Sequence, residues 1–124
     1  MEVHGQLGTD RGREFIDARH CPRFKLEVDI QIYPRDSTVI RGKTVDISES
    51  GVAAILVNEV ALGKVVRLEF ALPSGFVEVC ALVRQRTAFR YGFQFIDPGS
   101  VQDIIGRTCR ELAVEQAVQD PKSV

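Results

Sequence analysis

Two short motifs contain the residues best suited to binding chemistry. Arg19 and Arg23 are four residues apart, and a planar guanidinium makes paired hydrogen bonds to phosphate oxygens or to the O6 and N7 acceptors of guanine. Asp46, Ser48 and Gly51 form the pattern Asp-x-Ser-x2-Gly. A carboxylate accepts hydrogen bonds from the N–H groups of guanine, a hydroxyl donates to phosphate or carbonyl oxygens, and glycine allows a left-handed turn or a close backbone approach. Together the motifs supply groups that suit a phosphodiester bearing guanine.

Each motif by itself also has an ordinary structural explanation. Arginines spaced like Arg19 and Arg23 occur as solvated charges that precede a strand. In the second motif, Asp46 and Ser48 can bond to their own backbone in an Asx-type turn, while Gly51 serves only the bend. Taken alone, the residues leave both explanations open.

Four further side chains are candidates for the same site. His20 lies next to Arg19, and no residue in the sequence suggests a catalytic partner for it. Arg84, Arg86 and Arg90 would extend a basic patch toward a ligand, and outward charges on an exposed hairpin explain them equally well.

Length and charge limit the classes of partner. The chain has 124 residues, which suits one domain with a real core. A formal net charge of −1 and a pI of about 6.1 give no electrostatic footprint for DNA, RNA or an anionic membrane surface. The longest apolar run, residues 52–57, is far shorter than the roughly 20 residues of a spanning helix. We therefore expect a soluble cytoplasmic protein without membrane insertion, whose anionic ligand is small.

The three cysteines and two histidines form no metal-binding pattern. Cys21, Cys80 and Cys109 are widely spaced, as is typical of reduced thiols in a cytosolic protein. Cys80 and Cys109 fall within predicted elements, and we expect them to be small core residues. The arginines on either side of Cys21 favour its thiolate. We expect no zinc site and no cofactor.

Apolar and polar residues alternate with a period of two from residue 24 onward, which predicts six strands. Turn residues, mainly Gly, Pro and Asp, separate them. The predicted strands cover residues 24–33, 39–45, 52–57, 66–72, 77–86 and 91–95. Six short strands of this kind favour a small antiparallel barrel, which avoids exposed sheet edges by closure.

The two ends of the chain differ from this pattern. Near the C-terminus, apolar residues recur at helical spacing, which predicts a helix over residues 99–118 and a frayed tail over 119–124. Residues 1–17 have three glycines and only scattered apolar groups, so we expect a flexible arm. The barrel domain then occupies residues 18–98.

In this order, and with the segments between them, the two motifs resemble the PilZ domain family, whose members are receptors for the bacterial second messenger cyclic di-GMP. Residues 62–73 resemble the family's mid-barrel strand, and residues 83–84 with 90–95 resemble its closing hairpin. The resemblance covers about residues 18–98. It implies a mainly β fold: a six-stranded antiparallel β-barrel of the split-barrel type, followed by a C-terminal α-helix.

The resemblance also implies roles for the motif residues. It implies that Arg19 and Arg23 bind guanine and phosphate, and that Asp46, Ser48 and Gly51 hold the other side of the ligand. All five positions match the family pattern.

Two neighbouring positions are less conclusive. Ser50 stands where many members have a second glycine, which narrows backbone freedom without removing a contact group. Ala18 lies where the family's sequence influences whether one ligand or a stacked pair binds, and alanine leaves this stoichiometry open.

These observations lead to the hypothesis of a non-enzymatic bacterial receptor for cyclic di-GMP. Bound ligand would order the N-terminal arm and present a new surface to an unidentified downstream protein. The main alternative is a ligand-independent adaptor with the same barrel, acting through protein contacts. The sequence shows no nucleophile–base pair and no metal cluster, which an enzyme would need. A protein that binds single-stranded nucleic acid would need more outward-facing aromatic side chains. The sequence does not specify the oligomeric state.

Overall fold

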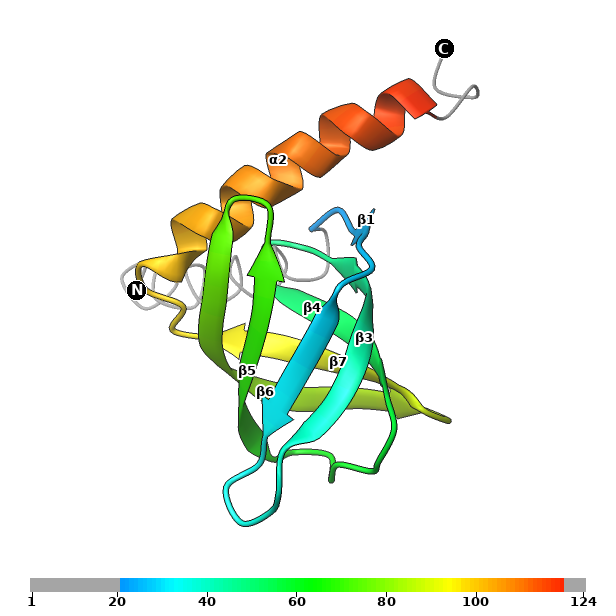
Figure 1. The fold of residues 1–124 in the computed structure, drawn as a ribbon, viewed down its shortest axis with the longest axis vertical. Helices are drawn as coiled ribbons and strands as arrows, with labels where there is room; N and C mark the ends of the chain where they lie inside the picture. Colours follow the sequence, from blue (N-terminus) through cyan, green and yellow to red (C-terminus); the bar gives the residue numbers. More distant parts are fainter. Residues whose placement is uncertain (1–20, 120–124) are drawn as a thin grey trace, which may run out of the picture.

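The computed structural model describes residues 21–119, and these residues form a seven-stranded sheet and one helix (Figure 1). In chain order the elements are β1 (Phe24–Lys25), β2 (Asp29–Tyr33), β3 (Ile40–Ile47), β4 (Gly51–Leu56), β5 (Val65–Leu72), β6 (Gly75–Thr87), β7 (Arg90–Ile96) and α2 (Val101–Gln119). Strands β2 to β7 make a closed antiparallel barrel, and β1 is an extra short strand. The predicted mainly β barrel with a C-terminal helix is confirmed.

The strand order explains how the barrel closes. Hydrogen-bonded neighbours follow the order β1-β3-β2-β5-β6-β7-β4, and β3 also pairs with β4. That additional pairing closes the sheet into a barrel, so neither β3 nor β4 is left as an open edge along its paired length.

The barrel interior contains the residues that period-two alternation assigned to it. Ile30 and Ile32 on β2, Leu68 and Phe70 on β5, and Tyr91 on β7 are each at most 2% exposed. Because every second side chain of a strand points to the same face, the intervening polar residues lie outside. The outer face is therefore the surface available for a ligand.

The first predicted strand, residues 24–33, is wrong in one respect, because it is two strands. Both β1 and β2 pair with β3, but β3 carries a bulge between Thr44 and Asp46 that shifts the register. Thr44 fills the break: its Oγ1 accepts from the Val28 N–H at 2.9 Å and donates to the Leu26 carbonyl at 2.5 Å. The alternation continues through the break, which is why the sequence pattern did not reveal it.

A second bulge lies in β6, between Val83 and Gln85, and Arg84 is the extra residue. Beyond it, β6 and β7 continue to a tight hairpin whose tip is Ala88 and Phe89. Ala88 has a φ of 55°, in the left-handed region that alanine rarely adopts. This hairpin brings the start of β7 to the same end of the barrel as the end of β4.

Helix α2 crosses one end of the barrel and extends past it (Figure 1). The part of the helix up to Leu112 packs Ile105, Cys109 and Leu112 into the barrel core, whereas Val114 and Val118 beyond it are 67% and 77% exposed. Cys109 is thus the core residue that the sequence predicted. Cys80 is not: it is exposed, because it lies on the outward phase of β6. Within residues 21–119, no helix combines the length and hydropathy needed to cross a membrane.

Candidate functional site

Asp46 lies on the outer face of the barrel between two arginines. Arg23 donates from Nε and Nη2 to Asp46 Oδ1 at 3.0 and 2.9 Å, and Arg90 donates from Nη2 to Oδ2 at 2.9 Å. The Asp46 side chain is only 15% exposed, while those of Arg23 and Arg90 are 50% and 49% exposed. Two guanidinium groups on one carboxylate leave a net positive charge that faces solvent. The structure therefore brings one residue of each motif into direct contact.

A pocket beside this cluster has a floor of small residues. Its volume is about 290 Å³, and its lining residues are Arg23, Ala53, Gln85, Thr87, Arg90, Tyr91 and Gly92. Ala53 and Gly92 are cross-strand partners on β4 and β7. Neither carries more than a methyl group, Ala53 is 3% exposed and Gly92 is partly buried, so the two arginines are the large side chains over this part of the sheet.

Ser48 shapes the loop between β3 and β4. It is 1% exposed, and its Oγ accepts from the N–H groups of Ser50 and Gly51, both at 3.2 Å. Its own N–H donates to the Gly51 carbonyl at 2.8 Å. The turn explanation therefore applies to Ser48, whereas the Asp46 carboxylate bonds to arginines and not to its own loop.

Gly51 is required for space and not for an unusual φ. It begins β4, and a Cβ at this position would lie 2.2 Å from the Phe93 carbonyl oxygen on β7. Of the two roles that the sequence allowed, a close backbone approach is the one found. Glycine here lets the start of β4 lie close against β7.

The other predicted binding residues do not line this pocket in the described part of the chain. Arg19 and His20 lie outside the described residues. Arg84 donates to Gln94 at 2.8 Å on the outer face. Arg86 donates to Glu59 at 2.8 Å, and its guanidinium lies over the Tyr91 ring, 5.7 Å from the centroid. Arg84 and Arg86 are thus not among the residues that line the pocket.

The model of the PilZ domain matches residues 17–111, more than half of the chain. The chain belongs to the PilZ domain family. Solved structures share the fold of this PilZ domain at low sequence identity, and a search of curated proteins gives no significant match.

Three of these structures illustrate the likeness. The PilZ domain of Escherichia coli YcgR with c-di-GMP has a TM-score of 0.67 and 18% identity, over 82% of this chain and 95% of that one. Bacillus subtilis MotI/DgrA, an inhibitor of motility, has a TM-score of 0.68 and 22% identity, over 78% of this chain and 52% of that one. The K. pneumonia MrkH–c-di-GMP complex has a TM-score of 0.66 and 18% identity, over 82% and 55%. The chain spans about half the length of MotI/DgrA and MrkH.

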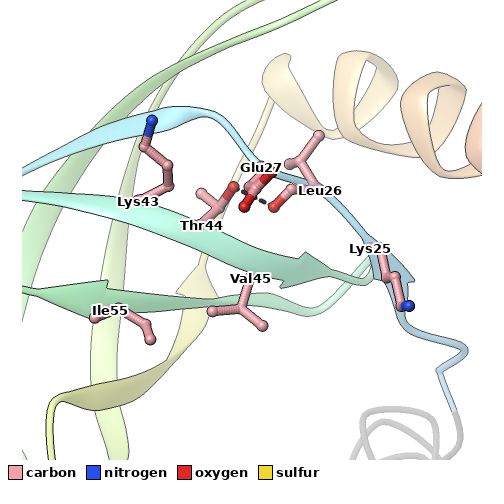
Figure 2. A pocket seen from close by; sticks show the side chains of 7 residues that line it. All are labelled: Lys25, Leu26, Glu27, Lys43, Thr44, Val45 and Ile55. Atoms are coloured by element: carbon pink, nitrogen blue, oxygen red, sulfur yellow. Dashed lines mark hydrogen bonds between the residues drawn. The ribbon is translucent and has the colours of Figure 1, made fainter.

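A larger hollow lies on the adjacent outer surface of this PilZ domain, where the first strand breaks (Figure 2). Its volume is about 700 Å³, and its lining residues are Lys25, Leu26, Glu27, Lys43, Thr44, Val45 and Ile55. There the hydrogen bond between Thr44 and Leu26 connects β3 to the segment between β1 and β2. None of the predicted ligand-binding residues lines this hollow, so we assign the site to the smaller pocket.

The sequence pattern missed the floor of the site. Ala53 and Gly92 occupy outward positions of predicted strands, and two small residues in that phase are a signal that would have indicated a surface with few side-chain atoms. Their adjacency depends on the pairing of β4 with β7, which alternation does not specify. In the described part of the chain, no group of three His, Cys, Asp or Glu side chains could hold a metal ion.

Proposed function

We propose that this PilZ domain is a non-enzymatic bacterial receptor for cyclic di-GMP, and that the pocket between Arg23 and Arg90 is its binding site. Two of the structures that share its fold, the YcgR PilZ domain and MrkH, contain c-di-GMP. The observation that carries the proposal is the contact of Arg23 with Asp46 on an open surface with a floor of small residues.

The chemistry of the ligand fits this arrangement. Phosphate oxygens and the O6 and N7 atoms of guanine are acceptors that suit a guanidinium fork, and guanine N1–H and N2–H2 are donors that suit a carboxylate. Arg23, with Arg19, supplies the forks, and Asp46 supplies the carboxylate. In this proposal Ser48 and Gly51 support Asp46 by fixing the loop behind it.

The proposed output is a cytoplasmic signal to a partner protein. Bound ligand would order residues 1–17, which lie outside the described residues, and present a new surface. Such an output requires that the ligand prefer the ordered state, because equal affinity for both states shifts no population.

Isothermal titration calorimetry with cyclic di-GMP tests the proposal and gives the stoichiometry. We expect the parent to bind, and Arg19→Ala, Arg23→Ala and Asp46→Asn each to weaken binding about tenfold or more, because charge-assisted hydrogen bonds contribute roughly 1.5–3 kcal/mol each. Arg67→Gln is the matched control: this β5 arginine pairs with Glu78 and lies outside the pocket.

Two results would contradict the proposal. If the parent released no heat and bound no ligand, the chain would be the alternative, a ligand-independent adaptor. If the double variant lacking Arg19 and Arg23 bound as tightly as the parent, the ligand would lie elsewhere on the protein.

A further inference from the structure

Both oxygens of Asp46 are already bonded, each to a different arginine. Arg23 holds Oδ1 and Arg90 holds Oδ2, and within residues 21–119 these are the donors to this carboxylate. For Asp46 to accept hydrogen bonds from a ligand, at least one of the two arginines must turn aside or share its oxygen. The two arginines also occupy the carboxylate unequally, because Oδ1 accepts two bonds from Arg23 and Oδ2 accepts one from Arg90.

The two arginines also stand on different supports. Arg23 precedes β1, which pairs with β3 through two residues only. Arg90 begins β7, where its main chain is paired on both sides, with Thr87 of β6 and with Ile55 of β4. A short terminal ladder opens at lower cost than a strand held on two sides. Arg23 is thus the arginine that moves more readily, and Arg90 is the fixed one.

We propose that Arg90 is a positioning residue that holds and neutralises Asp46 while Arg23 leaves this carboxylate for the ligand. This inference rests on the proposed function, because it describes how that same site changes when cyclic di-GMP enters. Arg90 acts through Asp46: its Nη2 keeps Oδ2 in place and leaves Oδ1 free to accept the guanine N–H donors.

The charge balance of the site gives the physical reason. Cyclic di-GMP carries two phosphodiester groups, and a carboxylate that is 15% exposed beside them repels them strongly unless a cation compensates it. When Arg23 turns to a phosphate, Arg90 is the cation that remains on Asp46. Without Arg90, a ligand that recruits Arg23 would leave the negative charge of Asp46 without a compensating cation at the edge of the pocket.

A double-mutant cycle measured by calorimetry with cyclic di-GMP tests this role. We expect Arg90→Gln to weaken binding at least about tenfold in the parent, and less than about twofold when Asp46 is already replaced by Asn, because the group on which Arg90 acts is then absent. Arg90→Lys keeps the charge and is expected to lose less affinity than Arg90→Gln. Arg67→Gln controls for the loss of a positive charge elsewhere.

The outcomes distinguish a failure of this inference from a failure of the function on which it rests. If the losses from Arg90→Gln and Asp46→Asn simply add, Arg90 contacts the ligand directly and the inference is wrong. If Arg90→Gln binds like the parent, Arg90 has no role in the site. If the parent itself does not bind, the proposed function fails and the role of Arg90 fails with it. Thermal melts of all variants show whether each is folded, which we expect because Arg90 is half exposed.

Discussion

Two glycines on neighbouring strands show how differently single residues constrain this site. A Cβ at Gly51 would lie 2.2 Å from the main-chain oxygen of Phe93, a separation that requires the β4–β7 ladder to move. A Cβ at Gly92 would lie 3.5 Å from the Gln85 side chain, which is ordinary van der Waals contact. Gly51 is thus needed for the fold, and Gly92 only keeps the pocket floor low.

We therefore expect Gly51→Ala to lower the free energy of unfolding by about 1–3 kcal/mol or more, the cost of overpacking, and Gly92→Ala to change it by less than about 1 kcal/mol. Urea denaturation followed by circular dichroism measures both. The two substitutions are chemically identical, so each is the control for the other. Equal stabilities of the two variants would show that the sheet adjusts freely at Gly51.

At the scale of elements, one side chain of α2 forms hydrogen bonds with the main chain of β1. The Gln116 Oε1 accepts from the Lys25 N–H at 3.1 Å, and its Nε2 donates to the Lys25 carbonyl at 2.8 Å. The side-chain amide therefore occupies the free edge of β1 as a neighbouring strand would. Since Arg23 lies two residues before Lys25, this contact links the second half of α2 to the proposed binding site.

Replacing Gln116 by Ala should loosen β1 without unfolding the barrel. We expect hydrogen exchange at the Lys25 amide to accelerate about fivefold, which corresponds to the roughly 1 kcal/mol of a typical hydrogen bond. Mass spectrometry of peptides from β1 and from the end of α2 measures the change. Glu115→Ala, which alters the adjacent exposed residue, is the control. Unchanged protection of β1 in Gln116→Ala would mean that pairing with β3 alone holds this strand.

The alternation of apolar and polar residues predicted the barrel because it follows which side chains are buried. It did not predict features that leave the burial of side chains unchanged. Leu26, which lies between β1 and β2, is 8% exposed, so the pattern of apolar residues is the same with or without a break at this point. The motifs supplied Arg23 and Asp46, and family resemblance suggested that they act together. Their contact spans 23 residues and that of Arg90 with Asp46 spans 44, so both depend on strand order, which no local pattern contains.

At the scale of the whole molecule, one core joins the barrel to α2. Ile105, Cys109 and Leu112 belong to the same buried cluster as the strand residues, so the helix as far as Leu112 and the barrel should unfold together. Cys109 reports on this unit, because it is 3% exposed and ionisable. Burial raises the pKa of the Cys109 thiol to about 11, with smaller contributions from the Glu49 carboxylate and the Cys21 thiol.

This raised pKa predicts a loss of stability in alkaline solution. Below pH 9.0, the ordinary thiol value, Cys109 is protonated in both states and the full stability is present. Between pH 9 and about 11 the unfolded thiol ionises while the native one keeps its proton, so the free energy of unfolding falls by up to about 1.4 kcal/mol per pH unit.

Other groups also titrate in this range, so the effect of Cys109 is measured as the difference in free energy of unfolding between the parent and Cys109→Ala. Urea denaturation of both proteins at several pH values from about 8 to 11 gives this difference. The cavity lowers the stability of the variant at every pH, and we expect its deficit to shrink as the pH rises. Cys80→Ala, at an exposed thiol, should follow the parent. Parallel pH profiles for the parent and Cys109→Ala would show that the thiol ionises equally in the native and unfolded chains, and that the end of the barrel under α2 is open to water.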